Sequence, residues 1–226
     1  MRLTVELPTL HRAQKAVLDG LPRFGVLAAG RRWGKSLLGT ELCVKAALEG
    51  RRAWWVGPDF PTAMVGWRMM CDMAVQIPVL SIHRGDMRIS APGGGWVQVK
   101  SAESTLRGEG LDFMVIDEAA HIAKLDVMWQ QALRPSLSDR QGGALFISTP
   151  KGHNHFYDLW CNAEHADGWA RWQFPTWSNP HIAASEVEAA RAQLPALVFR
   201  QEYGAEFVQM TGAMFKPEMF KMAELV

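Results

Sequence analysis

The sequence lacks the features that mark membrane, secreted and disordered proteins. No run of apolar residues approaches the roughly 18 that a membrane-spanning helix needs, and Glu6 and Pro8 stand where a signal peptide would carry its apolar segment. The three cysteines, Cys43, Cys71 and Cys161, are too far apart to open a zinc site. Neither sign of charge dominates, with 24 Lys and Arg against 23 Asp and Glu. We therefore expect a cytosolic globular protein with buried, reduced cysteines.

The length and composition of the chain suit one large domain, or one domain with a small appendage. The chain has 226 residues, of which 48% are hydrophobic, and a domain holds roughly 100–200 residues. Ten tryptophans are scattered without a period, which favours core packing, although one or two could stack on a base. Residues 1–52 carry ten Lys or Arg against four acidic residues. This basic part could face phosphates, or it could be an ordinary solvated surface.

Short apolar segments alternate with helical periodicity along most of the chain. Apolar segments bounded by Gly or Pro predict buried strands, and residues at helical spacing between them predict helices. The expected strands are 24–28, 53–56, 113–116, 144–148 and 172–174, with a hairpin formed by 88–91 and 96–100. The expected helices are 10–21, 37–48, 62–77, 126–133, 185–193 and one that ends near residue 203. The alternation predicts an α/β fold with a central, mostly parallel sheet.

The segment between the first strand and the second helix matches a phosphate-binding loop, except that its first glycine is replaced by alanine. The loop residues are Ala29, Gly30, Arg31, Arg32, Trp33, Gly34, Lys35 and Ser36. Backbone N–H groups of residues 30–35 can surround an anion at the positive end of the following helix. Lys35 would then contact the β- and γ-phosphates and Ser36 would contact Mg²⁺. The loop therefore predicts binding of a nucleoside triphosphate.

Two acidic residues follow the fully apolar strand at 113–116. Asp117 would hold Mg²⁺ through water, and Glu118 is suited to orient and deprotonate an attacking water. A second carboxylate of this kind separates motor ATPases from nucleotide kinases and most GTPases. An acidic helix cap would explain either residue alone but fits the pair poorly. The sequence therefore predicts hydrolysis in addition to binding.

Other polar residues are weaker candidates for a site. Ser148 and Thr149 end the next apolar strand, so they would lie at the same sheet edge and could sense the γ-phosphate, although Ser-Thr-Pro alone would indicate only a turn. Gln14 could read the adenine edge or could be an exposed helix residue. His153 and His155 lie two apart without a third ligand, so we expect loop residues rather than metal ligands.

Two arginines could neutralise negative charge in a transition state. Arg31 lies inside the phosphate-binding loop, and Arg107 lies ten residues before Asp117. An arginine finger contributes a factor of about 10³–10⁵ in rate, from the same subunit or from a neighbour. A surface loop is the alternative role for Arg107, and the sequence does not choose between the two.

Taken in order, these segments resemble one family, the large terminase subunit that packages DNA in tailed bacteriophages, and in particular its N-terminal ATPase domain. The resemblance covers nearly the whole chain. The matching segments are 10–14, 30–36 as an Arg-bearing Walker A loop, 55–58, 106–108, 115–120, 147–152 as the coupling motif, and 200–207. The ordered set is much more specific than any single member.

The resemblance implies a fold and a division of labour. The fold is a P-loop NTPase of the RecA and helicase-like type, with an additional strand, a catalytic glutamate and a small helical C-terminal lid. The Walker A loop and Asp117 would bind MgATP, and Glu118 would activate water. Thr149 would couple hydrolysis to movement, and Arg107 resembles a finger that acts across a ring of subunits.

The resemblance also implies partners. Family members translocate double-stranded DNA into a procapsid as a homo-oligomeric ring on a portal, with a small terminase subunit, in the cytoplasm of the host cell. They continue into an RNase H-like nuclease domain, whereas this sequence stops at Val226. We therefore expect no nuclease activity and no membrane partner for these 226 residues.

The expected organisation is an ATPase core at 1–180, a helical lid at 181–212 and the start of a linker at 213–226. The expected function is that of an ATPase motor domain. The alternatives are a helicase-like or remodelling ATPase of another pathway, a nucleotide kinase, which Glu118 disfavours, and a nucleotide-binding scaffold without enzymatic activity.

Overall fold

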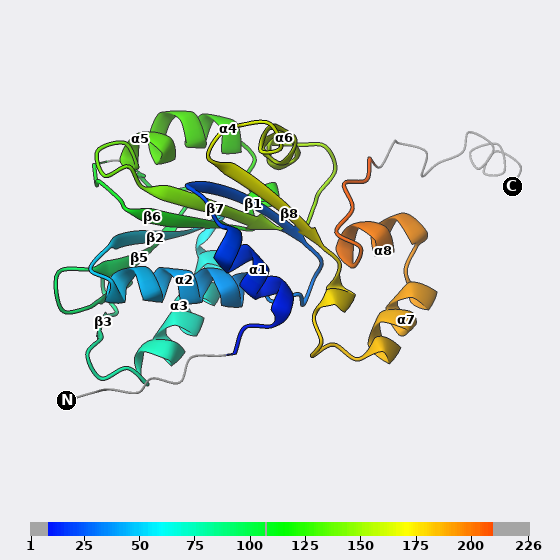
Figure 1. The fold of residues 1–226 in the computed structure, drawn as a ribbon, viewed down its shortest axis with the longest axis horizontal. Helices are drawn as coiled ribbons and strands as arrows, with labels where there is room; N and C mark the ends of the chain where they lie inside the picture. Colours follow the sequence, from blue (N-terminus) through cyan, green and yellow to red (C-terminus); the bar gives the residue numbers. More distant parts are fainter. Residues whose placement is uncertain (1–8, 107, 210–226) are drawn as a thin grey trace, which may run out of the picture.

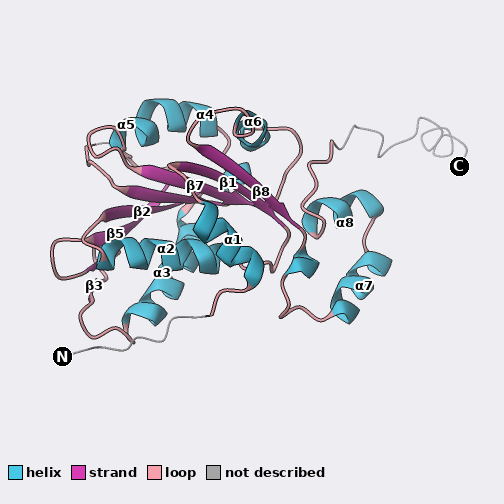
Figure 2. Ribbon diagram, in the orientation of Figure 1, coloured by secondary structure: helices cyan, strands magenta, loops and turns pink. Residues whose placement is uncertain are grey.

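The computed structural model describes residues 9–106 and 108–209, which form an eight-stranded sheet with helices on both faces (Figures 1 and 2). The strand order is β3-β4-β5-β2-β6-β7-β1-β8, and every neighbouring pair from β5 to β8 is parallel. The strands are β1 (Phe24–Ala29), β2 (Arg52–Gly57), β3 (Ser81–His83), β4 (Arg88–Ser90), β5 (Trp96–Ser101), β6 (Phe113–Asp117), β7 (Gly143–Ser148) and β8 (Trp169–Phe174). The predicted mostly parallel α/β sheet is confirmed.

The helices divide between the two faces of the sheet and one end of it (Figure 1). One face carries α1 (Arg12–Gly20), α2 (Lys35–Leu48) and α3 (Phe60–Ala74). The other carries α4 (Leu125–Met128), the π-helical turn η2 (Trp129–Leu133), α5 (Arg134–Ser136) and α6 (His155–Asn162). Beyond the carboxyl end of β8 lie α7 (Ala184–Gln193) and α8 (Ala196–Glu202). None of the described helices is long and apolar enough to cross a membrane.

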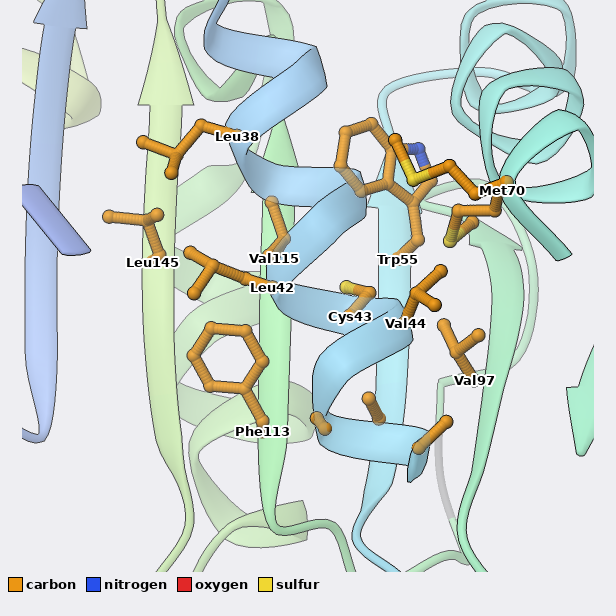
Figure 3. Packing of buried hydrophobic residues seen from close by; sticks show 14 of the residues in the cluster. Leu38, Leu42, Cys43, Val44, Trp55, Met70, Val97, Phe113, Val115 and Leu145 are labelled. Carbon is orange, nitrogen blue, oxygen red and sulfur yellow. The ribbon is translucent and has the colours of Figure 1, made fainter. Parts of the chain in front are cut away.

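The central strands are buried on both faces, so consecutive side chains enter two separate cores. On β2, Trp55 packs with Leu38 and Met70 in the core beneath α2 and α3 (Figure 3). The preceding residue, Trp54, packs on the opposite face in the core that contains Phe146. Both tryptophans are at most 1% exposed, so the prediction of core packing is confirmed for this pair.

Several helices differ from the sequence-based expectation, and for α3 and α6 the caps explain the difference. The helix α3 begins two residues early because Asp59 caps it, accepting a hydrogen bond from the Thr62 amide at 2.7 Å, with Pro61 in the first turn. The helix α6 was not expected at all. It begins at His155, capped by the Asn154 side chain, so the assignment of His155 to a loop was wrong.

Candidate nucleotide-binding site

The phosphate-binding loop joins the carboxyl end of β1 to the amino end of α2, as predicted. Gly34 is the N-cap residue of α2 and has a φ of 100°, a conformation that L side chains rarely adopt. A Cβ atom on Gly34 would also lie 2.6 Å from Nε2 of Gln14. The loop therefore requires glycine at this position for its backbone conformation and for the space beside it.

The backbone amides of the loop fall into two groups. The amides of Gly30, Arg31 and Trp33 donate to protein carbonyl oxygens, those of Phe174 at 3.0 Å, Glu202 at 2.7 Å and Gly30 at 3.3 Å respectively. Among the described residues, no side chain caps the amides at the start of α2, and these amides lie at the positive end of the helix dipole. The anion site is therefore narrower than the expected span of residues 30–35 and is centred on the first turn of α2.

Trp33 anchors the loop to the segment that follows β8. Its ring is fully buried and stacks on Phe174, with centroids 5.3 Å apart and planes 11° apart. The indole Nε1 donates to Ser178 Oγ at 2.8 Å, and the Asn179 side chain donates to the Arg32 carbonyl at 2.8 Å. Because the indole faces the protein interior, Trp33 fixes the loop and offers no stacking surface for a base.

The Gln14 side chain also makes a hydrogen bond to the loop. Its Nε2 donates to the Gly34 carbonyl at 2.9 Å, and its Oε1 accepts from the His11 amide at 2.9 Å. The residue is 2% exposed, so the alternative of an exposed helix residue is wrong. Reading an adenine edge would require the carboxamide to give up these bonds, and in this structure its role is to hold Gly34.

Lys35 is the buried cation of the site. Its Nζ donates to the carbonyls of Ala29 and Gly30 at 2.9 and 3.2 Å and to Thr149 Oγ1 at 3.0 Å. Burial lowers the pKa of the Lys35 ammonium, although the charges of Glu118 and Asp117 oppose this effect. The predicted proximity of Thr149 to the phosphate-binding lysine is thus present in the structure, because β7 lies beside β1.

Asp117 and Ser36 form the oxygen-rich part of the site. Ser36 Oγ lies 3.5 Å from Asp117 Oδ1, and Asp117 is 2% exposed. Burial and the neighbouring charge of Glu118 raise the pKa of Asp117 to about 7, against the opposing effect of Lys35. The protein alone therefore leaves this carboxylate short of positive charge.

Glu118 reaches the site from a strained backbone. It has a φ of 46°, which a non-glycine residue adopts at some cost. Its Oε2 accepts from Ser148 Oγ at 3.3 Å and lies 3.5 Å from His121 Nδ1. Burial acts to raise the pKa of Glu118, but His121, Lys35 and Ser148 together outweigh it and hold the pKa below its ordinary value. The residue is thus an ionised carboxylate at neutral pH.

Of the two candidate arginines, the structure describes one. Arg31 lies at the mouth of the site, where its Nε contacts Glu202 Oε2 at 2.5 Å and its side chain is 68% exposed. The hydrogen bond to Glu202 is the main cause that raises the pKa of Arg31. Arg107 lies outside the described residues, so its role as a finger stays a prediction.

Several of these side chains line one cavity of about 660 Å³ at the carboxyl edge of the sheet. Ligand pockets commonly measure about 300–1,000 Å³. The lining includes Arg31, Lys35, Ser36, Glu118 and Thr149, all predicted from sequence. The cavity can therefore hold a nucleotide with its phosphates between the Lys35 ammonium and the Glu118 carboxylate. Within the described ranges, no group of three His, Cys, Asp or Glu side chains suits a metal ion held by protein alone.

Four residues with roles at the site were missed by sequence reasoning. Thr176 Oγ1 donates to the Arg31 carbonyl at 2.8 Å, Asn179 holds the Arg32 carbonyl, His121 contacts Glu118, and Glu202 contacts Arg31. For His121 the signal was its position three residues after Glu118. The other three approach the loop only through the tertiary fold.

The fold and this site define a P-loop NTPase in which one strand, β7, separates the loop-bearing β1 from the acid-bearing β6. Residues 26–222 match the family model for the terminase large subunit, T4-like-virus type, N-terminal. The chain therefore belongs to the terminase large subunit family and corresponds to its N-terminal part.

Individual relatives agree with this assignment. The chain is 31% identical to the terminase large subunit of Thermus virus P23-45, over 91% of this chain and 50% of that protein. It is 28% identical to the protein of Escherichia phage T5, over 88% and 47%. The chain thus spans about half the length of the curated relatives it matches.

Solved structures give the same result for the fold. The large terminase ATPase domain of Thermus phage P74-26 superposes with a TM-score of 0.77 at 28% identity, over 88% of this chain and 94% of that chain. The large terminase of bacteriophage D6E in complex with ATP-gamma-S gives a TM-score of 0.71 at 14% identity, over 87% and 52%. The predicted family and P-loop NTPase fold are confirmed.

Proposed function

We propose that this chain binds MgATP and hydrolyses it to ADP and phosphate as the motor domain of a DNA-packaging terminase. The observation that carries the proposal is the convergence of Lys35, Glu118 and Thr149 on one cavity that borders the first turn of α2, with the buried Asp117 next to Ser36, which also lines the cavity. The complexes of the D6E enzyme with ATP-gamma-S and with ADP support the choice of an adenine nucleotide.

A magnesium ion fits the donor set of the site. Ser36 and Asp117 supply the hard oxygen atoms that Mg²⁺ prefers, and Ser36 Oγ lies 3.5 Å from Asp117 Oδ1. These two residues would hold the ion, directly or through water, and the ion would neutralise charge on the phosphate oxygens. Phosphate groups would complete its ligands, as is usual for nucleotide-bound Mg²⁺.

Other protein groups bind the phosphates, activate the water and sense the terminal phosphate. The first-turn amides of α2 and the Lys35 ammonium bind the phosphates. Glu118, held by Ser148 and His121, orients a water and accepts its proton. Thr149, bonded to Lys35, senses whether the terminal phosphate is present. This assignment gives Lys35, Glu118 and Thr149 roles that their contacts support.

The motor function involves partners beyond this chain. We assign double-stranded DNA as the translocated substrate, a homo-oligomeric ring on a portal as the working assembly, and the small terminase subunit as a partner, in the cytoplasm of the host cell. The proposed division is an ATPase core at 1–180, a helical lid at 181–212 and the start of a linker at 213–226. Nuclease activity is assigned to a separate C-terminal domain of the family.

The test is phosphate release from MgATP by the purified chain over a range of protein concentrations, with and without double-stranded DNA. The Lys35→Ala variant is the blank, because it removes the buried cation of the phosphate site. We expect turnover that rises more than linearly with concentration, since a neighbouring subunit completes the site, and that DNA stimulates. Tight ATP binding without turnover under any condition would instead favour a nucleotide-binding scaffold.

Two further measurements separate the motor from other ATPases. Inactive Arg107→Ala and Glu118→Gln chains should restore some activity when mixed in a ring, because an intact Arg107 and an intact Glu118 then meet at one interface. DNA binding should weaken steeply with salt, as phosphate contacts do. Mixed rings without activity would argue against a finger in trans, and DNA binding that ignores salt would argue for another partner.

A further inference from the structure

Six consecutive carbonyl groups of the phosphate-binding loop, from residue 29 to residue 34, accept hydrogen bonds from side chains. Lys35 Nζ donates to the first two. The other four are bonded to side chains from outside the loop: the Arg31 carbonyl to Thr176 Oγ1 at 2.8 Å, the Arg32 carbonyl to Asn179 Nδ2 at 2.8 Å, the Trp33 carbonyl to His11 Nε2 at 3.0 Å, and the Gly34 carbonyl to Gln14 Nε2 at 2.9 Å. The conformation of the loop is thus fixed by bonds to the protein itself.

Two of these four side chains come from the start of α1, where they also cap the helix. His11 Nδ1 accepts from the Gln14 amide at 3.4 Å, so the imidazole proton lies on Nε2, which faces the Trp33 carbonyl. Gln14 Oε1 accepts from the His11 amide at 2.9 Å, and its Nε2 donates to the Gly34 carbonyl. His11 is 8% exposed and Gln14 is 2% exposed. Each side chain therefore bonds to α1 with its acceptor atom and to the loop with its donor.

The bonds from His11 and Gln14 determine where two backbone amides point, because the C=O and N–H groups of a trans peptide unit lie on opposite sides. Since His11 holds the Trp33 carbonyl, the Gly34 amide is directed away from α1. Since Gln14 holds the Gly34 carbonyl, the Lys35 amide is directed away from α1 as well. Gly34 and Lys35 line the cavity at the first turn of α2, so the start of α1 orients two amides of the proposed phosphate site.

The same bonds leave Gln14 no free atom with which to read a base. A carboxamide recognises adenine through a paired acceptor and donor, and in Gln14 both atoms are bonded to the protein. The Gly34 backbone also lies against the carboxamide, since a Cβ atom added to Gly34 would be 2.6 Å from Gln14 Nε2. A base in the cavity would reach the carboxamide only by displacing the loop that binds its phosphates.

We infer that His11 and Gln14 are positioning residues that hold the Gly34 and Lys35 amides in the orientation that binds phosphate, and that Gln14 does not select the base. This inference rests on the proposed binding of ATP. The two residues raise the affinity of the site for every nucleoside triphosphate by the same factor, because they act on the loop and not on the base. A Gln14 that reads the adenine edge would instead raise the affinity for ATP alone.

The first test measures dissociation constants of MgATP-gamma-S, MgGTP-gamma-S and magnesium tripolyphosphate by calorimetry, for the wild-type chain and for Gln14→Met. Methionine keeps the length of the side chain and removes both hydrogen bonds. We expect all three ligands to bind about 3- to 10-fold more weakly, because a smaller fraction of the chains has the loop in its binding conformation. A loss confined to MgATP-gamma-S would show that Gln14 reads the base, and unchanged constants would show that it does not hold the loop. Either result overturns the inference.

Two further variants isolate the bonds to the loop. Gln76→Met makes the same chemical change just after α3, where Gln76 Nε2 donates to the Asp72 carbonyl at 3.0 Å on the exposed surface. It should leave all three constants unchanged, and a loss like that of Gln14→Met would contradict a role specific to the loop. His11→Asn keeps a good cap for α1, but asparagine is too short to reach the Trp33 carbonyl. It should weaken all three ligands equally, and it decides the question should Gln14→Met fail to fold.

Amide hydrogen exchange in the chain without nucleotide provides a readout that does not depend on affinity. The Trp33 amide donates to the Gly30 carbonyl at 3.3 Å within the loop, so its exchange should be faster in Gln14→Met and in His11→Asn. Exchange at Val26, which is fully buried in β1, should stay as in the wild-type chain. Equal acceleration at both amides would indicate a general loss of stability and would contradict the positioning role.

The outcomes separate this inference from the proposed function. A wild-type chain that binds MgATP-gamma-S no more tightly than Lys35→Ala does would contradict the proposed function. Tight binding by the wild-type chain, together with a loss in Gln14→Met that differs among the three ligands, would overturn the inference alone.

Discussion

The carboxylates at the two edges of the parallel sheet differ in the hydrogen-bond donors that the protein offers them. The amino edge is where the strands begin, and the carboxyl edge is where they end. At the amino edge, Asp112 accepts from the Arg52 amide and from Arg140 Nε, both at 2.8 Å, and Arg23 Nε donates to the Gly142 carbonyl at 3.1 Å. At the carboxyl edge, Asp117 is almost fully buried, and its nearest side-chain donor, Ser36, lies at 3.5 Å.

This difference shows which edge is built for stability and which is built for a ligand. A buried carboxylate with good donors contributes to folding, whereas one that is short of donors costs free energy until a ligand supplies positive charge. The carboxyl edge also holds Lys35, whose pKa is lowered by burial. We therefore expect substitutions at the carboxyl edge to abolish function without loss of stability, and substitutions at the amino edge to do the reverse.

The largest expected effect is at Glu118. Glu118→Gln removes the proton acceptor while Lys35 and the first-turn amides remain, so phosphate release should fall by a factor of about 10²–10⁴. Binding of MgATP, measured by calorimetry, should stay within about threefold of wild type, because the phosphate contacts are intact. Turnover near the wild-type rate would remove Glu118 from the proposed chemistry.

The second largest expected effect is a gain of stability when Asp117 is replaced. A carboxyl whose pKa rises from about 3.9 in the unfolded chain to about 7 in the folded chain stabilises the folded state most at low pH. That contribution is lost as the pH rises from about 4 to 7 and amounts to up to about 4 kcal/mol. Asp117→Asn should therefore raise the free energy of unfolding at pH 8 and change it little at pH 4.

Urea titrations at the two pH values check this prediction. A loss of stability at pH 8 would mean that Asp117 is well compensated by the protein and would erase the contrast between the edges. The same carboxylate must be ionised to hold Mg²⁺, so Mg²⁺-dependent ATP affinity in the wild-type chain should increase as the pH rises through about 7. In Asp117→Asn this increase should be absent.

The matched substitution at the amino edge should change the free energy of unfolding in the opposite direction. Asp112→Asn makes the same chemical change but weakens the two hydrogen bonds from Arg52 and Arg140. We expect the free energy of unfolding to fall by about 1–3 kcal/mol at pH 8. Phosphate release per folded molecule should be unchanged, because Asp112 lies at the far edge of the sheet. A stabilised variant would show that the two edges do not differ.

The fold of the carboxyl edge was predictable from the sequence because its strands are continuous apolar runs. β6 and β7 are buried on both faces, so each reads as an apolar segment that ends at a polar pair. β3 was missed because it has three residues, Ser81–His83, at a largely exposed edge. α6 was missed because its start depends on the Asn154 cap rather than on a long periodic pattern.

The site was predictable only as far as its motifs extend. Glu118 directly follows β6, and Lys35 begins α2 at the end of the loop after β1, so a local pattern locates both residues. The partner of Arg31 could not be found in this way, since Glu202 is 171 residues distant and contacts it only through the tertiary fold. The hydrogen bond from Gln14 to Gly34 could not be predicted either. The sequence shows that a carboxamide is present, but it does not show whether that group bonds to a ligand or to the protein.

The smallest expected effect tests whether the amino edge is stabilised by hydrogen bonds to backbone or by surface ion pairs. Arg140→Gln removes the partner of Asp112 but leaves the bond from the Arg52 amide. Because the Arg140 side chain is 39% exposed, solvent screens the pair and its loss should cost only about 0–1 kcal/mol. Urea titration should thus place Arg140→Gln between wild type and Asp112→Asn. A cost equal to that of Asp112→Asn would mean that the ion pair, rather than the bond from the Arg52 amide, accounts for the stability of this edge. The contrast with Asp117 would then be one of solvent exposure instead of hydrogen bonding.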